Sequence, residues 1–307
     1  MSGHGHHHHP GTLGTSNGGA SNGIAWAFFL NLSFTIIEFV GGYWFNSAAI
    51  MADAVHDLGD SFAIGLAWVF QHLSQKAANQ QYSYGYRRFS LLGALMNSAI
   101  LLFGAVWIVT ITLPRLAAPE MPNAQGMVIL AIFGCLVNGF AVYKLSKGTS
   151  LNEKALNLHL LEDVFGWVAI LIVAVTLNFK EWPLLDPILS LVFTVIIVYG
   201  AWGIFTSAAK VFLQAVPDTA AHKAIVECLT SIELVQEVHH LHFWSLDGER
   251  HVLTAHILLQ RELTQCEQQQ LKQTIAHNLS AFDLSHTTIE FEVPGEVCRD
   301  LDPHPHE

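Results

Sequence analysis

The chain has 307 residues, of which 51% are hydrophobic and 13% are charged, and its formal net charge at pH 7 is -11. This balance, together with a mean hydropathy of +0.38, excludes an ordinary soluble domain and indicates long apolar segments in a membrane. The negative charge is concentrated in the C-terminal third, where an acidic surface favours cations and argues against a nucleic-acid partner.

A Gly-rich arm over residues 1–22 opens the chain and carries a tract of histidines. The tract consists of His4, His6, His7, His8 and His9. Because neutral imidazoles bind Zn²⁺, we interpret the arm as a native cytoplasmic collector of zinc, with an expression tag as the alternative. The arm lacks the basic start, the apolar centre and the cleavage site that follow one another in a secretory signal, so we do not expect it to be one.

Six apolar stretches follow the arm, and each is long enough to cross a hydrocarbon core of about 30 Å, which needs roughly 20 residues. They cover about residues 24–45, 48–72, 88–114, 124–146, 154–178 and 185–207. Lysine and arginine gather in the loops after the second, fourth and sixth stretches, which by the positive-inside rule places both termini in the cytoplasm. The sequence therefore predicts a six-helix transmembrane domain over residues 23–208.

Two pairs of histidine and aspartate share one spacing inside these stretches: His56 with Asp60 in the second, and His159 with Asp163 in the fifth. Residues four apart lie on one helix face, so each stretch presents an imidazole and a carboxylate at one level. Two nitrogens and two oxygens complete a tetrahedral shell that suits Zn²⁺. A purely structural role is the alternative, but carboxylates in a membrane interior cost several kcal/mol, which a shared cation offsets.

Two more carboxyl groups accompany the pairs. Asp53 lies about one turn before His56, where it is either an outer partner that orients the imidazole or a polar contact inside the helix. Glu38 in the first stretch is either part of a water-filled path or a packing contact. Residue spacing does not choose between these interpretations.

After residue 209 the pattern changes to that of a small mixed domain. Pro217-Asp218 opens an amphipathic helix to about 231, and a second helix covers about 264–280. Alternating apolar residues predict strands at Val238–Leu246, Val252–Leu259 and Thr287–Val293. The order helix, strand, strand, helix, strand over residues 209–295 is that of a ferredoxin-like α+β domain, which a flexible tail over 296–307 follows.

This domain carries a second group of metal-binding side chains on or beside its predicted strands. The candidates are His239, His240, His256, Glu290 and Glu292. They predict a cytoplasmic zinc site, with ordinary surface histidines as the alternative. His242 shares a strand face with His240 because side chains alternate along a strand.

The four cysteines form no CxxC pair and are expected to be reduced thiols. Cys135, Cys228 and Cys266 are expected to be small, partly buried packing residues. The role of Cys298 stays open because Asp302, His304 and His306 follow it.

In these motifs the chain resembles the cation diffusion facilitators, and in particular their zinc-type branch. The resemblance covers nearly the whole chain and rests on five segments. They are the run from Asp53 through His56 to Asp60, the run from His159 through Asp163 to Gly166, Asp186-Pro187, the run from Val238 to Trp244, and Ala255-His256.

The resemblance implies a homodimeric transporter, not an enzyme, that moves Zn²⁺ out of the cytosol in exchange for protons by alternating access. It assigns His56, Asp60, His159 and Asp163 as the ligands, and a bacterial member would lie in the inner membrane. In the tail domain it favours His239, His256, Glu290 and Glu292 for cytosolic zinc.

Other functions stay open at this point. The transported ion is alternatively Cd²⁺, Co²⁺, Ni²⁺, Mn²⁺ or Fe²⁺, and a protein that binds metal without moving it would be a sensor. An intramembrane metal-dependent hydrolase is a third class, but it needs a general base and an open position on the metal.

Overall fold

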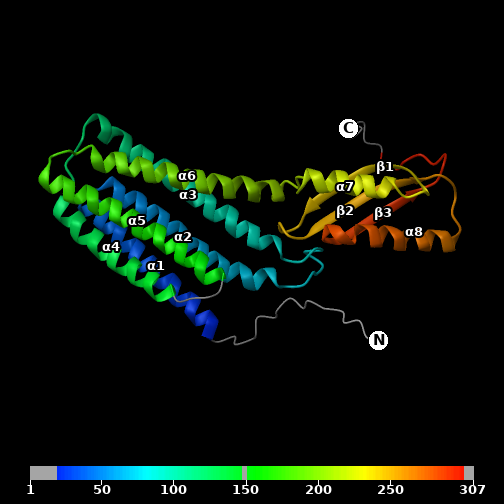
Figure 1. The fold of residues 1–307 in the computed structure, drawn as a ribbon, viewed down its shortest axis with the longest axis horizontal. Helices are drawn as coiled ribbons and strands as arrows, with labels where there is room; N and C mark the ends of the chain where they lie inside the picture. The colour runs from blue at the N-terminus through cyan, green and yellow to red at the C-terminus, as the bar shows by residue number, and fades with distance from the viewer. Residues whose placement is uncertain (1–18, 147–150, 301–307) are drawn as a thin grey trace, which may run out of the picture. The chain divides into compact units, whose positions relative to one another are not determined.

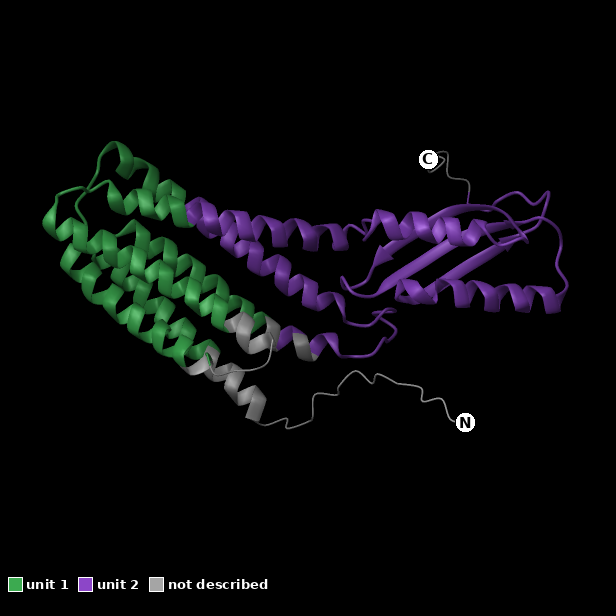
Figure 2. Ribbon diagram, in the orientation of Figure 1, with its two compact units in different colours: residues 1–68, 108–193 green, residues 69–107, 194–307 purple. Residues whose placement is uncertain are grey.

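The computed structural model describes residues 19–146 and 151–300. The histidine tract at residues 4–9 lies outside the described residues, as do Asp302, His304 and His306. Contacts between Cα atoms group the chain into two compact units, residues 1–68 with 108–193 and residues 69–107 with 194–307 (Figure 2). This division passes through three long helices, and the domain limits expected at 23–208 and 209–295 stay predictions.

Six long helices correspond one for one to the six apolar stretches, with limits that differ by a few residues (Figure 1). They are α1 (Gly19–Trp44), α2 (Ala48–Ser74), α3 (Arg88–Ala117), α4 (Ala124–Leu145), α5 (Leu151–Phe179) and α6 (Leu185–Phe212). Among the described residues, α3, α4, α5 and α6 each contain a segment long and apolar enough to cross a membrane. The apolar segment described in α1, Phe28–Trp44, is shorter, and α2 carries three aspartates.

Close packing of α4 against α5 places the fifth helix. Trp167 of α5 is 1% exposed, and its ring fills the space beside Gly134 of α4. A Cβ atom on Gly134 would lie 2.2 Å from Trp167 Cδ2, so only glycine permits this approach. The Phe34 ring of α1 lies 5.8 Å from the Trp167 ring, and α1 thereby joins the same core.

A buried carboxylate holds the start of α2. Asp186, in the first turn of α6, accepts hydrogen bonds from Ser47 Oγ at 2.5 Å, from the Ala48 amide at 2.6 Å and from the Ala49 amide at 3.2 Å. The first amides of a helix lack partners within the helix, and here an aspartate from another helix satisfies them. α2 and α6 are therefore joined where each begins.

The C-terminal part has the predicted order of elements. It consists of α7 (Thr219–Thr230), β1 (Val235–Ser245), β2 (His251–Leu259), α8 (Gln265–Asn278), the 3-10 helix η1 (Leu279–Phe282) and β3 (Leu284–Glu292). The sheet order is β1-β2-β3, with β1 antiparallel and β3 parallel to the central β2. This confirms the expected fold class, a helical membrane region followed by a small α+β domain, although β1 and β3 each begin three residues earlier than predicted.

The helices of this domain pack against one face of the sheet. Ile225 of α7 and Ile275 of α8 share a buried cluster with Leu253 and Ile257 of β2. Asp218 caps α7 by accepting from the Ala220 amide at 2.8 Å. The side chains that alternate with this apolar set, including His256, lie on the opposite face of the sheet.

Candidate metal centres

The structure brings the two histidine and aspartate pairs of the membrane helices into one group. His56 and Asp60 come from α2, and His159 and Asp163 come from α5. One ligand atom of each side chain lies within 4.8 Å of the ligand atoms of the other three. The His159 Nε2 atom is 3.0 Å from Asp60 Oδ2, and His56 Nε2 is 3.8 Å from both Asp60 Oδ2 and Asp163 Oδ1.

These distances suit a tetrahedral ion. Bonds of about 2.0 Å to nitrogen and oxygen place neighbouring ligand atoms about 3.3 Å apart, which lies between the observed 3.0 and 3.8 Å. Asp163 Oδ1 is buried and has no hydrogen-bond partner within residues 19–146 and 151–300. Because a buried carboxylate oxygen without a partner is costly, the group is suited to hold a cation.

The two accompanying carboxyl groups are buried nearby. Asp53 is 8% exposed and faces α5, where a Cβ on Gly166 would lie 3.4 Å from its Oδ1. Within the described part of the chain, no hydrogen bond joins Asp53 to His56, and Asp53 Oδ2 has no hydrogen-bond partner. Glu38 is fully buried on α1, and neither of its carboxylate oxygens has a hydrogen-bond partner in the part described.

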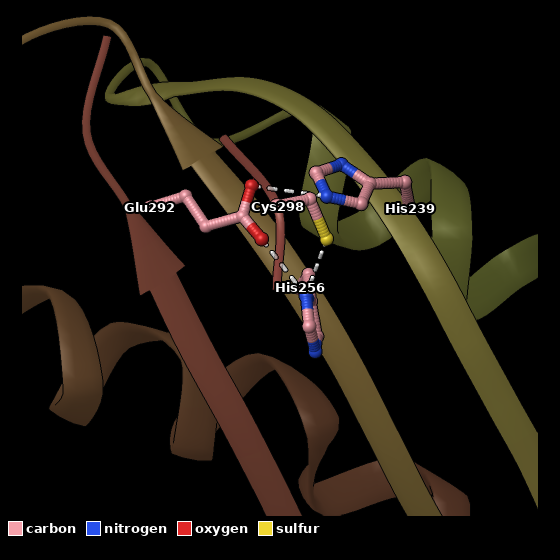
Figure 3. Close-up of side chains that lie close together, drawn as sticks. All are labelled: His239, His256, Glu292 and Cys298. Atoms are coloured by element: carbon pink, nitrogen blue, oxygen red, sulfur yellow. Dashed lines mark hydrogen bonds and ion pairs between the residues drawn. The ribbon is translucent and has the colours of Figure 1, made fainter. Parts of the chain in front are cut away.

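A second group forms on the face of the sheet opposite the helices, with one residue from each strand and one from the segment after β3 (Figure 3). His239 lies on β1, His256 on β2 and Glu292 on β3, and Cys298 follows. His256 Nδ1 is 2.8 Å from Glu292 Oε1 and 3.4 Å from Cys298 Sγ, and His239 Nε2 is 3.0 Å from Glu292 Oε2. The four ligand atoms again lie within 4.8 Å of one another.

Two of the five residues predicted for this domain are outside the group. His240 occupies the irregular register between His239 and His242, with a φ of 46° that turns its side chain away from the regular alternation. Glu290 Oε2 is 3.8 Å from His256 Nε2, but it is 2.9 Å from Arg299 Nη2 and so already has a cationic partner. Both residues line a cavity together with His256.

The surroundings of Glu292 in this second group favour its ionised form. Desolvation tends to raise the pKa of Glu292, but hydrogen bonds from Cys298 and His256 outweigh it and hold the pKa below its ordinary value. Desolvation and the neighbouring Glu292 raise the pKa of the Cys298 thiol. A bound cation would oppose that increase because it stabilises the thiolate.

Comparison with known proteins gives two family matches and several relatives. A family described as the cation efflux transmembrane domain matches residues 24–213, and one described as the cation efflux protein cytoplasmic domain matches residues 217–293. The zinc transporter ZitB of Yersinia pestis is 32% identical over 271 residues, which cover 87% of this chain and 86% of that protein.

Two further relatives carry names that are not limited to zinc. The metal cation efflux system protein CzcD of Cupriavidus metallidurans is 30% identical over 297 residues, 95% of this chain and 90% of that protein. The cadmium, cobalt and zinc/H(+)-K(+) antiporter of Bacillus subtilis is 27% identical over 270 residues, 87% of each chain.

Proposed function

Because the chain belongs to the cation efflux family, the cation diffusion facilitators that its motifs resemble, we propose that it exports Zn²⁺ from the cytosol in exchange for protons. The family and the relatives are metal-efflux transporters of the membrane, not enzymes, and this excludes the hydrolase alternative. The chain is thus an integral membrane protein that moves metal cations.

One observation carries the proposal: four potential ligand atoms from α2 and α5 lie within 4.8 Å of one another. The paired imidazoles argue against Mg²⁺ and Ca²⁺, which prefer all-oxygen shells, and favour Zn²⁺ or a similar transition metal. The relatives' names support zinc first, with cadmium and cobalt as alternatives of the same class. Ni²⁺, Mn²⁺ and Fe²⁺ are more distant alternatives.

Proton exchange follows from the chemistry of these ligands. Zn²⁺ requires neutral imidazoles and ionised carboxylates, and protons compete for the same lone pairs. In the proposed cycle the site binds Zn²⁺ facing the cytosol, reorients, and releases the ion as protons bind to His56, Asp60, His159 and Asp163. The protonated site then returns to face the cytosol and releases the protons there, so protons travel in the opposite direction to the metal.

The proposal also covers assembly and orientation. The match to the family's cytoplasmic domain supports a homodimer in which that domain lies in the cytoplasm. The basic loops support the same side for both termini. We place the protein in the inner membrane of a bacterium. In this arrangement the arm with His4 to His9 collects Zn²⁺ on the side from which it is exported.

Zinc uptake into proteoliposomes with an imposed proton gradient tests the proposal. We expect Asp163→Ala to abolish uptake, because it removes one ligand and leaves a three-residue shell. Glu162→Ala is the matched control, because Glu162 is the neighbouring carboxylate on α5 and is exposed. Uptake should be the same in this control as in the wild-type protein.

Each other outcome has a distinct meaning. Full uptake by the Asp163→Ala variant would show that the assigned site is wrong. Zinc binding by the wild-type protein with no flux of any metal would identify a sensor. Faster uptake of Mn²⁺ than of Zn²⁺ would leave the transport site in place and overturn the choice of substrate.

A further inference from the structure

The loop that joins α2 to α3 carries charge of one sign. Residues 75–90 contain Lys76, Arg87 and Arg88 and no aspartate or glutamate. The two helices have 27 and 30 residues, and so are about 40 and 45 Å long. A bilayer with its headgroups is about 40 to 45 Å thick, so a loop between these helices lies at the level of the phospholipid headgroups.

Only one of these three cations has a carboxylate partner among the residues that the structure describes. Arg87 Nη1 lies 3.6 Å from Asp247 Oδ2. In residues 19–146 and 151–300, Lys76 and Arg88 form no ion pair, and the buried Nε atom of Arg88 has no hydrogen-bond partner. A buried N–H group without an acceptor is costly, so Arg88 points to an acceptor that comes from outside this part of the chain.

A group of packed rings, the aromatic platform, accompanies the cations and consists of Phe70, Tyr82, Tyr86 and Phe89. Tyr86 stacks on Phe89 with the ring centroids 5.6 Å apart, and Tyr82 contacts these two rings at 4.4 and 5.8 Å. Phe70 of α2 lies 6.0 Å from Phe89 of α3. Lys76 Nζ is 5.9 Å from the centroid of the Tyr86 ring, so the platform holds this ammonium group at its face.

Hydrogen bonds within the loop fix its conformation. Asn79 Oδ1 accepts from the Gln81 amide at 2.9 Å and from the Tyr82 amide at 2.8 Å. Asn79 Nδ2 donates to Tyr86 Oη at 2.9 Å, and Gly85 has a φ of 78°, a conformation that favours glycine. Because these bonds already order the loop, a ligand that binds there loses little affinity to the ordering of the chain.

We propose that this loop binds the headgroup of an anionic phospholipid, with Lys76 and Arg88 donating to its phosphate. The Tyr82 and Tyr84 side chains, which are 41% and 46% exposed, lie among the headgroups, the level of a bilayer at which tyrosine is enriched. Each cation close to an anionic lipid surface strengthens binding by about fivefold. This proposal depends on the membrane location of the chain and not on the exchange of zinc for protons.

Native mass spectrometry of the purified full-length protein tests the proposal, with phosphatidylglycerol and phosphatidylcholine of the same acyl chains. We expect the wild-type protein to prefer phosphatidylglycerol, and Arg88→Gln to weaken the binding of this lipid by about fivefold. Arg87→Gln is the matched control because Asp247 already pairs with Arg87, and it should change the affinity by less than about twofold. Equal affinity of the wild type and Arg88→Gln for phosphatidylglycerol, or a wild type without lipid preference, would overturn the proposal.

Acylation of lysines in nanodiscs locates the lipid on the chain and needs no variant. Replacement of phosphatidylcholine by phosphatidylglycerol should slow the acylation of Lys76 more than that of Lys210, an exposed lysine in the last turn of α6 that serves as the internal reference. Equal slowing of both lysines would reflect the surface potential alone and would contradict a site at the loop. Protection of Lys76 by inorganic phosphate in phosphatidylcholine nanodiscs would identify a site for free anions and overturn the assignment to lipid.

Discussion

At the scale of single residues, Asp186 accounts for the geometry at the start of α2. The residue precedes Pro187 in the first turn of α6, and sequence alone suggested no role for it beyond a family motif. In the structure it is 1% exposed and accepts three hydrogen bonds from the residues that begin α2. A carboxylate distant in sequence thus adds to the local helix cap, in which Ser47 Oγ accepts from the Ile50 amide at 3.2 Å.

Removal of this carboxylate should destabilise the protein. Asp186→Ala leaves the Ala48 amide and the Ser47 hydroxyl buried without their partner, and we expect a loss of about 1 to 3 kcal/mol. Thermal unfolding in detergent measures the effect. Ser47→Ala is the milder comparison because it keeps the hydrogen bonds from the Ala48 and Ala49 amides to Asp186. If both variants were as stable as the wild-type protein, other contacts would hold the start of α2.

At the scale of elements, the contact between α4 and α5 depends on one glycine. Gly134→Ala would force a Cβ into the Trp167 ring, and we expect overpacking to cost about 1 to 3 kcal/mol. Gly139→Ala on the same helix is the control, because a Cβ there meets nothing within 4 Å. Thermal unfolding should rank Gly134→Ala well below Gly139→Ala, and the reverse order would contradict the packing described.

The first turn of α8 has a pH-dependent cap. Glu267 accepts from the Thr264 amide at 2.8 Å and from Arg261 Nη2 at 2.6 Å. Hydrogen bonds from Arg261 and Thr264 lower the pKa of Glu267 from its ordinary value of 4.5 to about 2. Because this pKa is depressed in the folded state, the stabilisation is complete above its ordinary value and is lost as the pH falls towards about 2.

Amide hydrogen exchange measures this effect locally. Glu267→Gln should reduce protection of the first turn of α8 at about pH 6, and the difference from wild type should shrink towards about pH 3. Glu262→Gln removes the same charge from an exposed position outside the capping box. A pH-independent difference, or equal loss of protection in both variants, would contradict the assigned role of the carboxylate.

At the scale of the whole molecule, an ion pair joins the loop after α2 to the turn after β1. Arg87 Nη1 is 3.6 Å from Asp247 Oδ2, and the two side chains are 41% and 13% exposed. Because the Arg87 side chain is exposed and the distance is long, we expect this ion pair to contribute less than about 1 kcal/mol. A double-mutant cycle with Arg87→Ala and Asp247→Ala should measure a coupling below that value, whereas a larger coupling would require a more buried contact.

The fold was largely predictable because its signals are long or strictly periodic. Apolar stretches predicted all six long helices, and alternation predicted the three strands. The membrane cluster was predictable because a four-residue spacing places His56 with Asp60, and His159 with Asp163, on one face of each helix.

The sheet cluster was predicted only in part because two of its determinants are not local. The register irregularity at His240 moves that residue out of the regular alternation, and a strand pattern does not reveal such a shift. Cys298 reaches the cluster through the turn at Gly295, which the sequence signals only as a Pro-Gly step. The partner that excludes Glu290, Arg299, lies in the same segment.

The bonds from Asp186 to the start of α2 have a mechanical consequence. Asp60 lies twelve residues beyond Ala48, about 18 Å along the helix axis. If α2 tilts as a rigid helix about its first residues, the displacement grows with distance from them. A tilt of about 10° would displace Asp60 by about 3 Å. That displacement equals the 3.0 Å between Asp60 Oδ2 and His159 Nε2. A small swing of α2 about its anchored end is therefore enough to open the cluster, while the anchor itself hardly moves.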